Sequence, residues 1–244
     1  MNGNLFRGAH CLLRGASLLG HPSLRLFVIV PLLVNIVIFA SLLGLTITFV
    51  NRTITGWMNS IPAWLGFIEW LVWPLLVLVF GLLAGYVFTT LALLIASPFN
   101  NLLAEKAEEL VTGKPVAALG GLAAALRAMP QGLMRELHKL WYYVPMAVLV
   151  LVLSFIPGIN VASPLLWLLL GAWMMSLQFI DYPMDNHQLG FADVREAARR
   201  HRLSSMGFGG LVALFASIPV VNFFVVPAAV VGATLLWCED LQQQ

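Results

Sequence analysis

One short polar sequence stands where the first long apolar segment of the chain begins. It reads Pro22-Ser23-Leu24-Arg25. The first turn of a helix exposes backbone N–H groups and the positive end of the helix dipole, and both attract anions. Arg25 adds a permanent charge with forked donors that fit a tetrahedral oxyanion, and Ser23 can cap the helix or donate to the anion. These residues predict an oxyanion site; the alternative is that Arg25 only anchors the helix at the cytoplasmic face.

A second group of polar residues has the right types for a metal site but the wrong spacing. Asp181, Asp185 and His187 cannot all lie on one helical face, and Pro183 interrupts the segment. We therefore expect helix capping and interface anchoring there, and no metal site. The two cysteines lie near opposite ends of the chain, outside any metal-like cluster, and we expect both to be small buried or lipid-facing residues.

Catalytic motifs are absent from the sequence. It has no glycine-rich phosphate loop, no His-Glu-x-x-His, no cysteine pair and no Gly-x-Ser-x-Gly. We therefore expect neither an enzyme nor a cofactor. Arg195, Arg199 and Arg202 line one side of a charged segment, and attraction to lipid explains them most simply. A nucleic-acid partner is not expected.

Four charge-free apolar stretches make up more than half of the 244 residues, of which 60% are hydrophobic and 10% charged. These values indicate an all-α integral membrane protein. Residues 26–50 and 70–96 are each long enough to cross a bilayer core, which takes roughly 20 apolar residues. The sequence therefore predicts two long transmembrane helices, at about 24–50 and 70–96.

The other two stretches, residues 142–180 and 203–238, are too short for two full crossings and a turn, which need more than about 40 residues. Each is interrupted near its middle by Ile-Pro-x-x-Asn, at residues 156–160 and 218–222. We expect two partly inserted helical hairpins. The shared motif also predicts a repeated element of the kind common in transporters, although Pro and Asn suit any tight turn.

Positive charge is placed unevenly along the chain. Of 13 Lys and Arg residues, 12 fall in residues 1–25, 97–141 and 181–206, whereas the loop between the first two spans holds only Arg52. Short basic loops stay in the cytoplasm. We therefore expect both termini and the two charged middle segments to be cytoplasmic, and all of residues 1–244 to form a single membrane domain.

Two amphipathic segments occupy residues 97–141. Residues 102–111 read as one helix, which stops at Gly113. A second apolar stripe extends from Leu122 to Leu140, is kinked or divided by Pro130, and carries Arg127, Arg135 and Lys139 on its polar side. This basic face could lie on anionic headgroups or line an ion vestibule.

Four sequence motifs, in order along the chain, resemble the CysZ sulfate permeases. They are His21-Pro22-Ser23-Leu24-Arg25 with the apolar run to Asn35, Ser97-Pro98-Phe99-Asn100-Asn101 with the run to Glu105, Phe155-Ile156-Pro157-Gly158-Ile159-Asn160, and Asp181-Tyr182-Pro183-Met184-Asp185-Asn186-His187. The resemblance implies an all-helical oligomer in the bacterial inner membrane, with two long spans and two partly inserted hairpins. It implies uptake of sulfate for cysteine synthesis; sulfite and related oxyanions are not separated from sulfate by the sequence.

The family's Gly-Leu-Arg sulfate loop, often followed by a second Arg, corresponds here to Ser23, Leu24, Arg25 and Leu26. Ser replaces the Gly, and Leu26 replaces the second Arg, so a neighbouring cation could help. The resemblance offers Lys106, Arg127 and Arg135 as candidates for that cation. It offers Asn35, Asn100 and Glu105 as polar residues along the route, with helix packing and capping as their alternative role.

No carboxylate lies inside any of the four apolar stretches, and no ATP-binding motif is present. Entry of a dianion into a negative cell costs about 4.6 kcal/mol at 100 mV. Without an evident proton relay, we expect channel-like or facilitated flow that is sustained by sulfate consumption. The alternative class is a membrane scaffold that binds a partner without transport.

Overall fold

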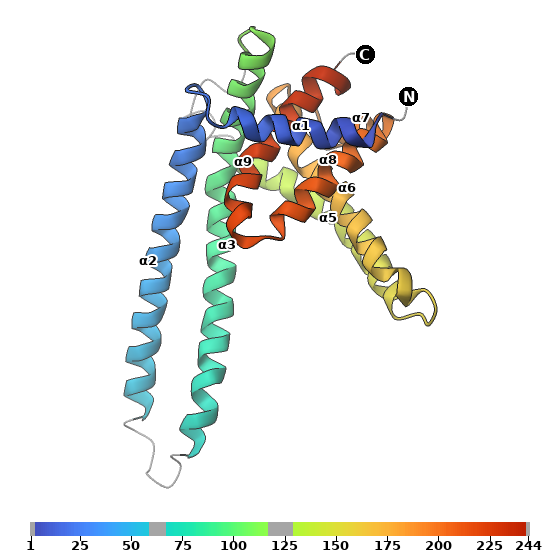
Figure 1. Ribbon diagram of the computed structural model, residues 1–244. Coiled ribbons are helices and arrows are strands. Elements are labelled where there is room, and N and C mark those ends of the chain that lie inside the picture. Colours follow the sequence, from blue (N-terminus) through green and yellow to red (C-terminus); the bar gives the residue numbers. More distant parts are fainter. Residues whose placement is uncertain (1–2, 59–66, 117–128, 243–244) are drawn as a thin grey trace. The chain divides into compact units, whose positions relative to one another are not determined.

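The computed structural model describes residues 3–58, 67–116 and 129–242, and within these ranges the secondary structure is helical (Figure 1). This confirms the all-α fold. In chain order the elements are α1 (Leu5–Leu18), α2 (Arg25–Met58), α3 (Phe67–Thr112), α5 (Met129–Ser154), the short 3₁₀ turn η2 (Asn160–Ala162), α6 (Ser163–Asn186), α7 (Phe191–Arg200), α8 (Arg202–Ala216), α9 (Pro219–Leu236) and the π-helical turn η3 (Trp237–Leu241).

The chain forms two compact units. One contains residues 1–29 and 97–244, and the other contains residues 30–96. Each unit is apolar and helical, and the prediction of one membrane domain over residues 1–244 stays a prediction. Both the predicted oxyanion site and the charged middle segments belong to the first unit.

The second unit contains the parts of the long helices α2 and α3 that fall within residues 30–96, and these parts lie side by side (Figure 1). The rings of Phe49 and Phe80 meet edge to face, with their centres 5.4 Å apart. In the most apolar 18-residue window of α2, within Arg25–Arg52, no residue is buried in the protein. An apolar helix without a protein covering is stable in a bilayer and not in water. Helix α2 therefore has the length and the exposed apolar surface of the predicted transmembrane helix, in agreement with an all-α membrane protein.

One predicted helix break was wrong. We expected residues 102–111 to form a helix separate from the second span, but α3 continues through Pro98 as one helix of 46 residues. The polar end keeps an apolar face, because Leu102, Leu103 and Ala107 are all buried. This packing offsets the hydrogen bond that Pro98 cannot donate. The predicted stop at Gly113 is confirmed, with φ at +67°.

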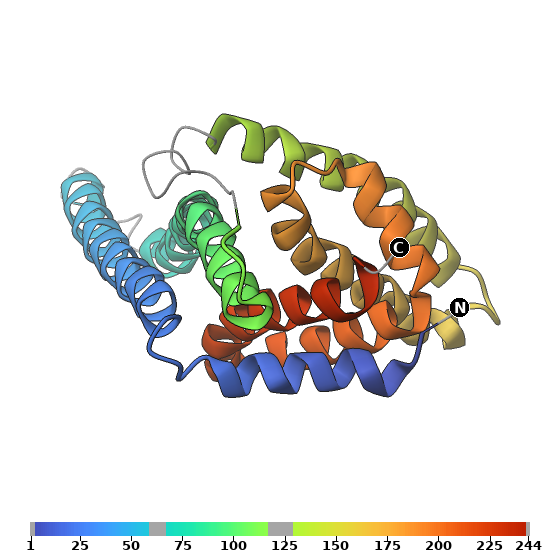
Figure 2. The same ribbon diagram turned by 90° about the horizontal axis from the view of Figure 1, so that it is seen from above.

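The core of the first unit is built from α1, α6, α8 and α9. Figure 2 shows α1 lying along α8 and α9. Glycines permit this close approach: a methyl group on Gly8 would lie 1.8 Å from the carbonyl oxygen of Ser204, and one on Gly15 would lie 2.5 Å from that of Ala228. Helix α1 was not predicted from the sequence. Salt bridges of 2.6 Å from Arg7 to Asp240 and from Arg14 to Glu239 also connect it to the C-terminal end.

Both Ile-Pro-x-x-Asn motifs lie at the turns of helical hairpins, as predicted. The two turns differ in conformation. Between α5 and α6 the chain uses eight residues, including Gly158 at φ +87° and the 3₁₀ turn. Between α8 and α9 only Ser217 and Ile218 intervene, and Pro219 opens α9. The two hairpins therefore share the position of the motif at the turn but not the geometry of the turn.

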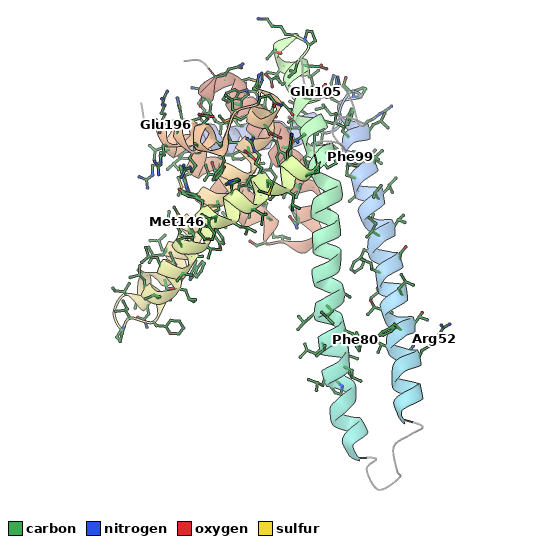
Figure 3. All side chains as sticks on the ribbon, turned by 180° about the vertical axis from the view of Figure 1, so that it is seen from behind. Arg52, Phe80, Phe99, Glu105, Met146 and Glu196 are labelled. Carbon is green, nitrogen blue, oxygen red and sulfur yellow. The ribbon has the colours of Figure 1, made fainter. Side chains whose placement is uncertain are left out.

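The arms of the first hairpin extend further than the predicted range 142–180. Helix α5 starts at Met129, so Pro130 lies in its first turn, and α6 continues to Asn186. The charged residues that flank the apolar stretch thus belong to the same helices. The tip is bare: Phe155 and Val161 are 80% and 83% exposed (the arm that carries Met146 in Figure 3).

Candidate functional site

His21 organises the turn that precedes α2. Its carbonyl oxygen accepts hydrogen bonds from the N–H groups of Leu24 (2.9 Å) and Arg25 (3.1 Å), and its Nδ1 accepts one from the N–H of Ser23 (3.3 Å). The backbone N–H groups of Ser23, Leu24 and Arg25 are therefore already engaged. Anion recognition by these three residues is left to their side chains. His21 is the residue that the sequence analysis overlooked, although it begins the motif.

The side chains of the turn point to different environments. Leu24 is completely buried, in the same apolar cluster as Leu103 and Ala107 of α3, and it fixes the turn against the protein. Ser23 and Arg25 are exposed. Arg25 has no carboxylate within salt-bridge distance among the described residues. The turn thus presents one uncompensated guanidinium on a rigid, buried base.

The other candidate residues have counter-ions or polar partners. The Lys106 ammonium lies 2.7 Å from Glu109 and 3.5 Å from Glu105, and the hydrogen bond to Glu109 raises the pKa of Lys106 despite partial burial. The amide of Asn100 donates to the Tyr182 hydroxyl at 3.2 Å. Glu105 is buried near the end of α3 (Figure 3). Arg127 lies outside the described residues, as does the side chain of Asn35, a residue of α2.

Arg135 occupies the centre of a buried ionic cluster that joins α5 to α6. Its guanidinium contacts Asp181 at 2.6 Å and Asp185 at 2.7 Å, and Asp181 also accepts from Lys139 at 2.7 Å. The side chains of Lys139 and Asp181 are 5% and 4% exposed. Because charges so deeply buried must be paired, this cluster fixes the two helices against each other.

The cluster also reaches α3. Asn101 donates to Asp185 at 3.2 Å, Asn186 donates to the Asn101 carbonyl at 3.0 Å, and His187 lies 2.8 Å from Glu108. Asp181 and Asp185 therefore serve as ion-pair partners between helices, where we had expected caps. The sequence held a signal for this: Arg135 and Lys139 are four residues apart, as are Asp181 and Asp185, so each pair shares a helical face.

An open groove of about 1100 Å³ lies beside this cluster. We call it the α5–α7 groove. It is lined by Trp141, Tyr142, Pro145 and Met146 of α5 and by Phe191 and Arg195 of α7. Further lining residues include Pro98 and Asn101 of α3, Arg135 and His138 of α5, and Asp185 of α6. Within the described part of the chain, no group of three or more His, Cys, Asp or Glu side chains is placed to hold a metal ion.

The fold and the turn before α2 define a class: a multi-pass α-helical membrane protein whose first long helix starts with an arginine that has no carboxylate partner among the described residues. The family described as "Sulfate transporter CysZ/Etoposide-induced protein 2.4" matches residues 11–227, and the chain belongs to this family. The resemblance noted in the sequence is thereby confirmed.

Curated relatives match nearly the full length of the chain, and those described here are called "Sulfate transporter CysZ". The relative from Pectobacterium atrosepticum is 44% identical over 95% of this chain and 84% of its own length. The relative from Pseudomonas paraeruginosa is 42% identical over 96% of this chain and 95% of its own length. The relative from Salmonella enteritidis is 42% identical over 95% and 92%, respectively.

Proposed function

We propose that this protein carries sulfate into the bacterial cell across the inner membrane, where the sulfate feeds cysteine synthesis. Family membership supports this proposal, as do the names of relatives that match at least 95% of the chain. The multi-pass helical fold provides the membrane-embedded scaffold that such transport needs.

Sulfate binds, in this proposal, at Ser23, Leu24 and Arg25. The observation that carries it is the exposed Arg25 guanidinium, which lacks a carboxylate partner in the described part of the chain while Lys106 and Arg135 have theirs. Arg25 provides the charge-assisted donors, the Ser23 hydroxyl provides one more, and buried Leu24 holds both in place. Because Leu26 is 63% exposed and uncharged, the site has one cation fewer than the family pattern.

The route beyond this site remains a proposal that rests on Asn35, Asn100, Glu105, Lys106, Arg127 and Arg135. The counter-ions of Lys106 and Arg135 bear on it, because an anion passing either residue would compete with a carboxylate at 2.7 Å. We therefore assign these two residues to electrostatic balance along the route, and assign capture of sulfate to Arg25.

Family resemblance supports a homo-oligomer, and the distribution of Lys and Arg supports cytoplasmic termini. We propose that flow is channel-like. Sulfate entry against 100 mV costs about 4.6 kcal/mol, and consumption inside the cell offsets this cost. Sulfate flux into proteoliposomes should persist when the proton gradient is abolished; strict dependence on that gradient would overturn passive flow.

The sulfate site is tested by comparing Arg25→Ala with Arg202→Ala in a binding assay on the purified protein. Arg202 is also exposed, and it starts α8. Loss of a charge-assisted hydrogen bond at an exposed site should weaken sulfate binding about tenfold in Arg25→Ala. Binding by Arg202→Ala should remain close to that of the unchanged protein.

The result that would refute the site is equal sulfate affinity in both variants. Uptake into proteoliposomes separates the site from the function. If Arg25→Ala binds and transports sulfate normally, the site is wrong while the transport proposal stands. If the unchanged protein neither binds nor transports sulfate, the function itself is wrong.

A further inference from the structure

Arg195 is the cation of the α5–α7 groove for which the described residues provide no counter-ion. Its guanidinium carbon lies 5.0 Å from the ring centre of Tyr142 and 5.6 Å from that of Phe191. Its Nε is buried and has no hydrogen-bond partner among the described residues. The carboxylates on its own helix are used elsewhere, because Asp193 accepts from the N–H of Gly190 and Glu196 pairs with Arg200.

The other ionised side chains that line the groove are paired. Arg135 and Asp185 form a salt bridge with each other. The Nδ1 of His138 forms a hydrogen bond of 2.8 Å with the Met134 carbonyl oxygen, so only its other ring nitrogen is left for further contacts. The groove therefore carries one uncompensated positive charge, on a planar guanidinium that two aromatic rings hold in position. Such a group selects an anion with several acceptor oxygens, such as a phosphodiester.

The remaining walls of the groove include the polar residues Asn101, Gln131 and Gln188 but are mainly apolar, and they continue onto the exposed apolar surface of α5. Trp141 is 82% exposed, and Val148 and Leu149, further along the same helix, are each more than half exposed. Trp and Tyr at positions 141–143 stand between the charged start of α5 and its apolar end, where a membrane helix meets the headgroup layer. A ligand in this groove would thus have its anion at headgroup level and its apolar part on α5.

We propose that the α5–α7 groove binds one anionic glycerophospholipid, with its phosphate on Arg195 and its acyl chains along α5. A lone sulfate ion would leave most of the 1100 Å³ and all of the apolar walls unused. This site differs in position and ligand from the proposed sulfate site at Arg25, and the two proposals stand or fall separately.

The test uses the full-length protein in phosphatidylcholine nanodiscs that contain a small fraction of phosphatidylglycerol. One of the two lipids carries bromine on its acyl chains, because bromine quenches nearby tryptophan fluorescence. The signal of Trp141 is the difference between each variant and the same variant with Trp141→Phe. We expect Trp141 to be quenched severalfold more by brominated phosphatidylglycerol than by brominated phosphatidylcholine at equal mole fraction.

Arg195→Gln should abolish this preference. Arg199→Gln removes the same charge one turn further along α7, from an exposed residue outside the groove, and should retain the preference. Equal loss in both variants would overturn the proposal in favour of diffuse attraction to the basic face. Loss of the preference on addition of excess sulfate would overturn it in favour of a free-oxyanion site.

A conservative pair covers the case in which Arg195→Gln does not fold. Arg195→Lys keeps the charge but loses Nε and the planar stacking on Tyr142 and Phe191. It should reduce the phosphatidylglycerol preference at least twofold, whereas Arg199→Lys should not change it. Equal preferences in the two lysine variants would refute the assignment to Arg195.

Discussion

Asp181 of α6 forms ion pairs with two cations at once. One of its oxygens lies 2.6 Å from the Arg135 guanidinium, and the other lies 2.7 Å from the Lys139 ammonium. Buried cations need a nearby anion, so the Asp181 carboxylate offsets the cost of burying both Arg135 and Lys139 in the first unit. The other acid of the cluster, Asp185, is more exposed and contacts Arg135 without Lys139 in the described structure.

Asp181→Asn should therefore destabilise the fold strongly. Removing one partner of a buried pair typically costs about 3–5 kcal/mol. Glu196→Gln is the control, since Glu196 and Arg200 are both more than half exposed and such a pair contributes about 0.5 kcal/mol. Thermal unfolding in detergent, followed by circular dichroism, should show a lower Tm for Asp181→Asn and an almost unchanged Tm for Glu196→Gln. Similar Tm values would mean that the cluster does not stabilise the helices.

The thiol of Cys11 should be nearly inert in the folded protein. Cys11 is 1% exposed, and burial, helped by the charges of Glu239 and Asp240, raises its pKa from 9.0 to about 11. The reactive form is the thiolate. A shift of two units lowers its fraction about 100-fold at any pH well below 9. In a Cys238→Ser background, maleimide labelling at pH 7.5 should be at least 100-fold slower in the native state than in denaturant.

At the scale of helices, apolar periodicity and length predicted the main elements. The main error concerned where one helix ends and the next begins. The two long spans and both hairpins follow from charge-free stretches of adequate length. The joining of residues 70–96 with 102–111 into α3 could not be predicted from Ser97-Pro98, because the packing that offsets the proline comes from distant residues. Helix α1 was missed because its apolar face is short and broken by glycines that only contact with α8 and α9 explains.

In the candidate site, too, the features set by neighbouring residues were predictable, and those set by contacts or by conformation were not. The start of α2 at Arg25 was predictable from the local sequence, and the structure agrees. The engagement of the turn's N–H groups by His21 was not predictable, since it depends on the conformation of three consecutive residues. The neutralisation of Arg135 required a contact between residues about 50 positions apart, which a single sequence shows only as matched spacing.

Gly209 and Gly210 offer a paired test of close helix packing. A methyl group on Gly209 would lie 1.9 Å from the Ala172 carbonyl oxygen of α6, whereas one on Gly210 would lie 3.6 Å from the Ala172 side chain. Gly209→Ala must therefore push α8 away from α6, at about 1–3 kcal/mol or more. Gly210→Ala meets no clash and gains helix propensity. We expect a lower Tm for Gly209→Ala only; equal Tm values would contradict the tight α6–α8 contact.

At the scale of the whole molecule, the number of full membrane crossings decides which residues share an aqueous face. The Trp173 indole donates to the Tyr142 hydroxyl at 3.2 Å, so these two aromatic residues mark one level on α5 and α6. From that level to the hairpin tip, α5 continues to Ser154 and α6 begins at Ser163. At 1.5 Å per residue these arms are about 15–18 Å long, roughly half of a 30 Å bilayer core.

The tip at Val161 should therefore lie within the lipid and be unreachable from either aqueous face. In nanodiscs, where both faces are open, a membrane-impermeant maleimide should label Arg52→Cys and Lys114→Cys rapidly and Val161→Cys at least tenfold more slowly. All three side chains are exposed on the protein itself, so a difference in rate measures lipid burial. In detergent at high reagent concentration, Val161→Cys should react, which shows that its thiol is intact. If Val161→Cys is labelled as fast as Arg52→Cys in nanodiscs, the hairpin crosses the bilayer completely, and its tip faces the compartment opposite to that of its two ends.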